Sequence, residues 1–298
     1  MFKTKRVISI VAALTLAISC MAGLVSCGSQ SSEPQSAKDV IERYSQENPS
    51  NFNIKGDITL NMGVSGMTMN MPMSMDFDIN GKNYHGTYSA SVLGTEAKGE
   101  MYTVEKDGKI LTYSKTDASG SMFGMSSSSG DTGWTVTEME EGDVSSIDAV
   151  VNELIEKASF EKTENGYLVS FGGEDAYEIL MKAISESGNS AASAVSEIPQ
   201  EVTDFIKALK IDLAFDKNCN LTEVSIPETK SSMTIQGQTM DIDVSSNFAV
   251  SKHGEIAEIV VPDDIVNSAK ATSSPVDVAS TAAEASESSA SAEASKAA

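Results

Sequence analysis

The chain has 298 residues, with 43 aspartates and glutamates against 21 lysines and arginines, so its formal net charge at pH 7 is −22. A surface of this charge repels phosphate backbones and anionic head groups, which speaks against nucleic-acid binding. Between its polar ends lie about 230 residues, enough for one domain with a substantial core.

The first 26 residues have the layout of a secretory signal peptide. Lys3, Lys5 and Arg6 form a basic start, and an apolar run occupies residues 7–18. That run is too short to be read as a spanning helix. We therefore predict that residues 1–26 are removed from the mature protein.

The sequence LVSCG at residues 24–28 resembles the lipobox of bacterial lipoproteins. The resemblance implies cleavage after Ser26 and attachment of a diacylglyceryl group, with acyl chains such as palmitate, to the thiol of Cys27. Cys20 lies in a weaker second box, and a plain secretory signal is the alternative. Two acyl chains suffice for stable attachment, so we expect a protein anchored to the extracytoplasmic face of the cell membrane.

Both ends of the mature chain are predicted to be unstructured. Residues 27–35 are Ser-rich and read as a flexible tether. Residues 271–298 are rich in Ala, Ser and Glu and carry no large aliphatic residue after Val278, so we expect a disordered tail. Maturation removes three positive charges, which changes the formal net charge from −22 to −25. With Cys27 acylated, Cys219 has no partner for an internal disulfide.

Residues 36–270 are predicted to form a single domain that begins with a short helix capped by Ser36. Residues 58–64 then alternate between apolar and polar side chains, as in a half-buried strand. The phase of this alternation slips at Ser65-Gly66, which predicts a hairpin turn or bulge. A second strand follows at residues 67–79.

Dipeptides typical of tight turns predict two further hairpins, and a long polar loop follows them. Asn80-Gly81 predicts a type I′ hairpin, and Asp107-Gly108 predicts another, so this part reads as an antiparallel meander. A Ser/Gly-rich loop at residues 115–133 carries the candidate lid residues Met122, Phe123 and Met125. A disordered loop with incidental apolar residues is the alternative.

After Trp134 the apolar period changes from 2 to 3.6. Residues 144–158 and 176–184 have helical apolar faces, with the short strand GYLVSF between them, and a third helix is predicted to begin at Pro199. Two further hairpins are predicted, with a loop at residues 216–220 and a turn near Gly237.

Several segments together resemble one known family. They are, in chain order, SAKDVIERYS, DITLNMGVSG, MTMNMPMSMDFDI, GEMYTVEKDGKILTYSK, Trp134 and IVVPDDIVNSA. Their type and order resemble the lipoprotein-carrier superfamily, LolA-like and LppX-like, and particularly its Gram-positive surface lipoproteins. The resemblance implies an α+β fold in which a curved antiparallel sheet, a half-barrel, wraps around a few helices. It also implies an apolar cavity that holds acyl chains or stays closed, without catalytic residues.

Methionine occupies every second position from 67 to 75, and the alternation continues at Phe77 and Ile79. Methionine is unbranched and polarizable, which suits an apolar surface that adapts to its contacts. We interpret this face as packed core or as the lining of a ligand cavity. The candidate lining residues are Met67, Met69, Met71, Met73, Met75, Phe77, Met240 and Ile242.

Two metal sites are alternatives to this interpretation, a copper site on the methionines and a calcium site at residues 76–81. Thioethers bind Cu(I), but the chain offers only His85 and His253 as imidazole ligands, and burial explains the methionines without copper. Residues 76–81 match the first half of an EF-hand loop, but Thr87 stands where a bidentate glutamate is needed. We therefore predict neither a metal site nor a cofactor.

Signals for catalysis are weak. The chain has no nucleophile elbow, zinc-protease motif, P-loop or dinucleotide fingerprint. Ser159-x-x-Lys162 stands without partner motifs, and Cys219 is expected in a polar turn without an activating histidine. We expect a non-enzyme. One hypothesis is an anchored lipoprotein that binds or carries a lipid or another hydrophobic molecule, and the other is an envelope scaffold with a filled core that acts through unidentified protein partners.

Overall fold

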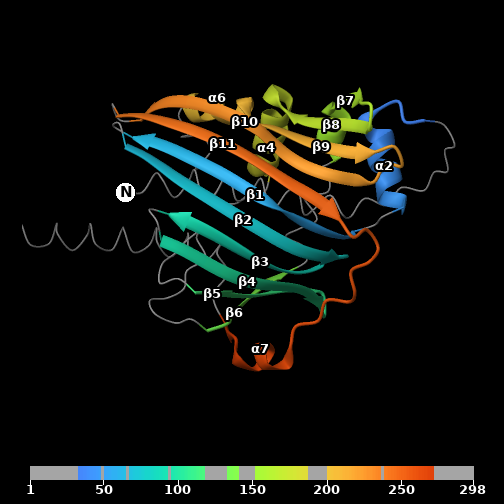
Figure 1. Cartoon of the computed structure of the whole chain (residues 1–298), viewed down its shortest axis with the longest axis vertical. Helices are drawn as coiled ribbons and strands as arrows, with labels where there is room; N and C mark the ends of the chain where they lie inside the picture. Colours follow the sequence, from blue (N-terminus) through green and yellow to red (C-terminus); the bar gives the residue numbers. More distant parts are fainter. Residues whose placement is uncertain are drawn as a thin grey trace, which may run out of the picture.

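The computed structural model describes residues 33–47, 50–64, 67–92, 95–117, 133–140, 152–186, 200–235 and 238–271. Within these ranges, twelve strands form one sheet in the order β12-β6-β5-β4-β3-β2-β1-β11-β10-β9-β8-β7. Neighbouring strands are antiparallel except for the short parallel pair β12 and β6. The sheet is curved and does not close into a barrel (Figure 1).

The strands are β1 (Asn51–Val64), β2 (Met67–Asn80), β3 (Asn83–Val92), β4 (Thr95–Lys106), β5 (Lys109–Thr116), β6 (Thr135–Glu140), β7 (Ser159–Lys162), β8 (Gly166–Gly172), β9 (Lys210–Asp216), β10 (Leu221–Ile235), β11 (Gln238–Ser251) and β12 (Lys270–Ala271). The helices are α2 (Ala37–Glu47), α4 (Gly173–Glu186), α6 (Gln200–Ala208) and α7 (Asp263–Ser268), and residues 152–157 are also helical. Figure 1 shows α2, α4 and α6 on the β8–β11 half of the sheet and α7 beyond its other end, beside β6.

The predicted N-terminal helix and its cap are confirmed. The backbone N–H of Asp39 donates to Ser36 Oγ at 3.1 Å, which satisfies one of the free donors at the start of α2. The Asp39 carboxylate accepts from the backbone N–H of Gln35, and this bond lowers the pKa of Asp39. Val40, Ile41 and Tyr44 are buried, as their helical spacing predicts.

The predicted hairpins are present, but one turn type is wrong. Asp107 and Gly108 both have positive φ, as a type I′ turn requires. After β2, by contrast, Asn80 pairs with Asn83 and the loop consists of Gly81 and Lys82. Only Gly81 has positive φ there, the pattern of a type II′ turn. The strand extends one residue further than expected, because Asn80 pairs with Asn51 of β1.

Pairing of β1 with β11 joins the first meander to the last one. The register runs from Asn53 opposite Ser251 to Val64 opposite Met240. In β10 the register to β11 shifts between Ile226 and Thr229, where Pro227 lies within the continuous strand. Because proline cannot donate to the ladder, a bulge is a position that accommodates it.

One face of β1, β2 and β11, here called the methionine face, carries the main core. Successive side chains of a strand alternate between faces, so this face holds the even positions of β1 and the odd positions of β2. The larger cluster on it combines residues of α2, the 152–157 helix and the sheet. A second cluster packs Phe205 and Ile206 of α6 against β1, β2 and β11. The most buried members of the larger cluster are Val40, Val169, Leu213, Cys219 and Val224.

A third, smaller cluster lies on the opposite face, here called the polar face, at the β4–β6 end. Tyr113, Val261 and Ile265 are its buried residues, so α7 and the segment before it pack there. The expected change to a helical period after Trp134 is wrong for residues 135–140, which form β6. The side chain of Val136 packs against this cluster. The side chain of Thr135 lies on the other face, where its hydroxyl and that of Ser114 share a hydrogen bond of 3.1 Å. The strand is short, and its pairing partners are β5 and the distant β12, so local periodicity did not reveal it.

Candidate functional site

The methionines of β2 lie where the alternation places them, on the face covered by helices. Met73 belongs to the larger cluster, and Met71 packs in the second cluster, with exposed fractions of 9% and 8%. Met69 and Met240 pack against that second cluster, whose members include Ile242. The side chain of Met67 lies outside the described residues. Most of the stripe is therefore packed against core residues.

Five further apolar residues of this face form a surface that is only partly buried. Each pairs directly or diagonally with another member across β2, β3 and β4. The rings of Phe77 and Tyr84 meet edge to face with centroids 6.1 Å apart. We call this set the aromatic surface, and it consists of Met75, Phe77, Tyr84, Tyr88 and Met101.

Glycines on neighbouring strands make room for two of these rings. A Cβ atom on Gly86 would lie 2.4 Å from the ring of Phe77, and one on Gly99 would lie 2.2 Å from the ring of Tyr88. The rings therefore lie over positions that have no side chain. The Tyr88 hydroxyl shares a hydrogen bond of 2.8 Å with Thr116 Oγ1, which fixes its ring orientation.

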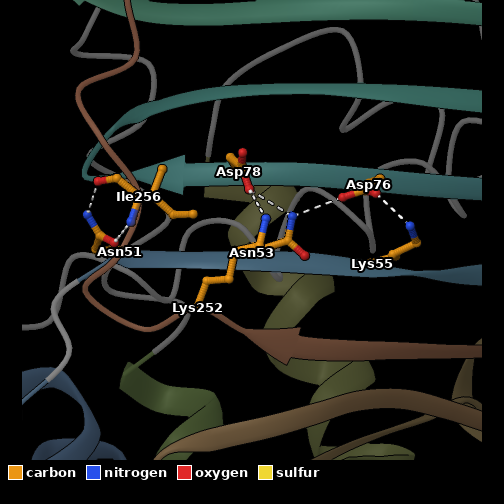
Figure 2. A network of polar contacts seen from close by, with 7 residues as sticks. All are labelled: Asn51, Asn53, Lys55, Asp76, Asp78, Lys252 and Ile256. Carbon is orange, nitrogen blue, oxygen red and sulfur yellow. Dashed lines mark hydrogen bonds and ion pairs between the residues drawn. The ribbon is translucent and has the colours of Figure 1, made fainter.

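The polar face of the same strands carries a network centred on Asn53, whose side chain is buried (Figure 2). Its amide donates to Asp76 Oδ1 at 2.9 Å and to Asp78 Oδ1 at 2.8 Å. Lys55 donates to Asp76 Oδ2 at 2.8 Å, and Lys252 approaches Asp78 at 3.7 Å. The bond from Asn53, followed by that from Lys55, lowers the pKa of Asp76.

The same network holds the segment between β11 and α7 in place. Asn51 Nδ2 donates to the carbonyl of Ile256, and the Ile256 N–H donates back to Asn51 Oδ1, both at 2.9 Å (Figure 2). Asn80 donates to the carbonyls of Ile256 and Ala257. These bonds fix the path by which the chain reaches α7.

A groove of about 550 Å³ crosses β1 to β5 on the polar face. Its floor is the backbone of Gly56, Met75, Tyr88 and Gly99, which are cross-strand neighbours whose side-chain positions point to the methionine face. One wall consists of Lys55, Asp76, Thr87, Glu100 and Lys115. The other wall consists of Asp57, Ser74, Ser89, Lys98 and Asp117.

The possible metal ligands are used in other contacts. His85 stacks on Tyr102 with centroids 4.0 Å apart and lies 3.0 Å from Glu100, on the face opposite the methionines. Asp76 and Asp78, from the half-matched calcium loop, share the amide of Asn53. Within the part of the chain that the structure describes, no group of three or more His, Cys, Asp or Glu side chains is placed to hold a metal ion.

Cys219 differs from its expected environment. It lies in the β9–β10 turn with φ of 62°, but its exposed fraction is 1% and it belongs to the larger core cluster. Its polar sequence neighbours bond to one another, because the Asp216 carboxylate accepts from the backbone N–H groups of Asn218 and Asn220. The expectation of a polar setting was therefore wrong. Cys27 and the lid candidates Met122, Phe123 and Met125 lie outside the described residues.

The sequence matches a family described as a family of unknown function (DUF6612) over residues 36–270. The chain belongs to the DUF6612 family. The match covers the part of the DUF6612 chain from before α2 to the start of β12. No curated protein matches it.

Among solved structures, one that resembles the DUF6612 chain is a DUF1329 family protein from Desulfovibrio piger. The two are 11% identical, and the alignment covers 72% of this chain and 90% of that chain with a TM-score of 0.23. A score this low does not establish a common fold. Over the described residues, none of the helices combines the length and the apolarity needed to cross a membrane.

Sequence reasoning missed the groove and the α7 cluster. The polar positions of β1 to β5 are visible as alternation, but only the register brings Lys98 beside Ser89 and Glu100 beside Lys115. The aromatic surface was partly anticipated through Met75 and Phe77. Its two tyrosines occupy even positions of β3 and therefore lie on one face. Once the β2–β3 hairpin is predicted, this spacing places them beside the methionine stripe.

Proposed function

We propose that this DUF6612 protein is a lipid-anchored, extracytoplasmic binding protein of the LolA-like type that holds a lipid or another hydrophobic ligand. The observation that carries the proposal is the aromatic surface, where five large apolar side chains stay partly exposed next to the packed core. Contiguous apolar surface that stays partly in contact with water is typical of a binding site. Covering it with an acyl chain removes that area from water, which is favourable.

The side chains of the aromatic surface suit a ligand without fixed shape. Met75 and Met101 can change rotamers at low cost, because methionine is unbranched. Phe77 and Tyr88 lie over Gly86 and Gly99 and offer flat apolar area. We infer that the site binds by shape and apolar contact and that the protein performs no catalysis. The arrangement of a curved sheet with α2, α4 and α6 over its β8–β11 half agrees with the LolA-like interpretation.

The anchoring part of the proposal rests on the sequence LVSCG at residues 24–28. A diacylglyceryl group on Cys27 makes the membrane its partner. Cys27→Ala should abolish labelling with a fatty-acid probe and release the protein from the membrane fraction. If the variant is still labelled and still sediments with membranes, the anchor is assigned wrongly.

Ligand binding is tested on the full chain extracted in mild detergent. Native mass spectrometry should detect a co-purifying lipid, and a fluorescent fatty acid should bind to the delipidated protein. Met75→Gln and Met101→Gln should each weaken that binding about tenfold, since each places a polar amide on an apolar site. Thr87→Gln, exposed on the polar face, is the matched control and should bind as the parent does.

The outcomes separate the carrier from the scaffold with a filled core. If the parent protein carries no lipid and binds no fluorescent fatty acid, the aromatic surface is not a ligand site. If Thr87→Gln loses as much affinity as Met75→Gln, the probe binds elsewhere. Either result favours the scaffold.

A further inference from the structure

The groove on the polar face is a second site, separate from the aromatic surface. It crosses five strands, and each of these strands is paired on both sides, from β1 between β11 and β2 to β5 between β4 and β6. The backbone N–H and C=O groups of the groove residues on β1 to β4 are therefore engaged in the sheet, whereas β6 pairs with β5 only up to Ser114, before Lys115. Over β1 to β4 a ligand in this groove meets side chains, so it does not bind there by adding a strand, as an extended peptide does.

The charges of the groove nearly balance. Three lysines and four carboxylates line it, within a chain whose formal net charge is −22. The two walls carry opposite charges on the same strand, as Lys55 and Asp57 do on β1 and Glu100 and Lys98 on β4. Within a wall, Glu100 is paired in register with Lys115, and Lys98 lies next to Asp117. A strongly anionic ligand would meet the four carboxylates, and a polycation would meet the three lysines. The groove therefore favours a polar ligand without net charge.

Some of these groups already have partners, and others do not. Lys55 binds Asp76 at 2.8 Å, and the hydroxyls of Ser74 and Ser89 share a hydrogen bond of 2.7 Å. Within the described residues, no hydrogen bond or ion pair engages the side chains of Asp57, Lys115 and Asp117. Two acceptors and one donor thus remain at the two ends of the groove, with the hydroxyls of β2 and β3 between them.

We propose that this groove binds an uncharged oligosaccharide. Each sugar hydroxyl both donates and accepts, so it can satisfy the carboxylates of Asp57 and Asp117 and the ammonium group of Lys115 without adding charge. The groove volume of about 550 Å³ falls within the range of small-molecule sites. Because the walls lie on the polar face, this site can be occupied while the aromatic surface holds its own ligand.

Titration calorimetry on the full chain in detergent micelles tests the proposal. The probes are chitotetraose and maltotetraose as uncharged sugars, tetragalacturonate as an anionic sugar and spermine as a polycation. We expect at least one uncharged sugar to bind, and to bind more tightly than either charged probe. Asp57→Ala and Lys115→Met should each weaken that binding at least fivefold. Asp241→Ala, on β11 of the same face but outside the groove, is the control and should leave binding unchanged.

Three results would overturn the proposal. The first is that neither uncharged sugar binds the parent protein. The second is that tetragalacturonate or spermine binds more tightly than both of them. The third is that Asp241→Ala loses as much affinity as Asp57→Ala, because the sugar would then not lie in the groove. Circular dichroism of each variant checks that its fold is retained.

Discussion

The two ends of the sheet bury opposite faces. From β2 through β1 to β8, the methionine face is covered by helices and carries two large apolar clusters. At the β4–β6 end, the polar face is covered instead by α7, and among the described residues the cluster there has three buried members, Tyr113, Val261 and Ile265. The same alternation of side chains therefore serves two separate cores on one continuous sheet.

This difference predicts unequal stability along the sheet. A large cluster removes much apolar area from water, whereas three buried residues remove little. Regions with few buried apolar contacts open locally at a lower free energy than the global unfolding reaction. We expect the α7 end to open before the helix-covered end unfolds, and the following substitutions test that order.

The largest effect is expected for a charge in the helix-covered core. Met71→Asp places a carboxylate in the second cluster, where Met71 is 8% exposed. An unpaired buried charge costs roughly 3–5 kcal/mol, so the free energy of unfolding should fall by about that amount. Urea denaturation followed by circular dichroism measures it. Thr68→Asp, exposed on the polar face of the same strand, should change stability by less than about 0.5 kcal/mol.

Equal losses from Met71→Asp and Thr68→Asp would contradict the assignment of the two faces. The polar side chain of Asn70 is less suitable as a control, because its amide donates to Asn61. Thr68 has no such contact among the described residues, so its substitution reports on exposure alone.

A cavity in the larger cluster should have the next largest effect. Leu213 is 1% exposed and lies on β9 between β8 and β10. Leu213→Ala removes buried methyl groups and leaves a cavity, which should lower the free energy of unfolding by about 2–5 kcal/mol. Urea denaturation should show the whole transition shifted as one step. A loss below about 1 kcal/mol would mean that this part of the core is less well packed than its burial indicates.

A similar truncation at the other end should act locally. Ile265→Ala in α7 weakens a cluster with only two other buried residues, and we expect a loss of about 2 kcal/mol or less. Hydrogen exchange should become faster for the amide of Ala269, which donates to the carbonyl of Ile265, while exchange at Val224 stays slow. Equal acceleration at both sites would show that the two ends unfold as one unit.

Much of this architecture was predictable because it depends on local pattern. The phase slip at Ser65-Gly66 predicted two strands, and β1 and β2 pair as a hairpin around it. The helical faces of α2, α4 and α6 were likewise visible as apolar periodicity, with Phe205 and Ile206 buried as expected. These signals need no information from distant parts of the chain.

The errors share a different cause. Gly81 and Lys82 form the β2–β3 loop because Asn80 continues β2, where it pairs with Asn51 of β1 and with Asn83 of β3. Cys219 is buried because the core under the β9–β10 turn accepts its side chain, although its sequence neighbours are polar. The α7 cluster arises only when α7 packs on β4 to β6, and the groove only when β1 to β5 pair in register. Strand register and long-range packing determine such features, so they cannot be predicted from the sequence of any single segment.

The smallest effect is expected from the Asn53 network on the polar face, on the side of the sheet opposite the large core. Asn53 and Lys55 hydrogen-bond the Asp76 carboxylate and lower its pKa below the ordinary 3.8. The folded state thus favours the ionised form, so this stabilisation is complete above pH 3.8 and is lost as the pH falls through the lower pKa of the folded state. Because the side chains of Lys55 and Asp76 are 69% and 41% exposed, we expect at most about 1 kcal/mol.

Asp76→Asn should therefore reduce stability at about pH 7 and pH 5, and the difference from the parent should shrink at about pH 3. Urea midpoints at these three pH values measure it, with Asp241→Asn as the control on the same face. A difference that grows as the pH falls would mean that the Asp76 carboxylate is destabilised by folding. A difference that rivals that of Leu213→Ala would show instead that the polar network, and not the core beneath it, holds β1 and β2 together.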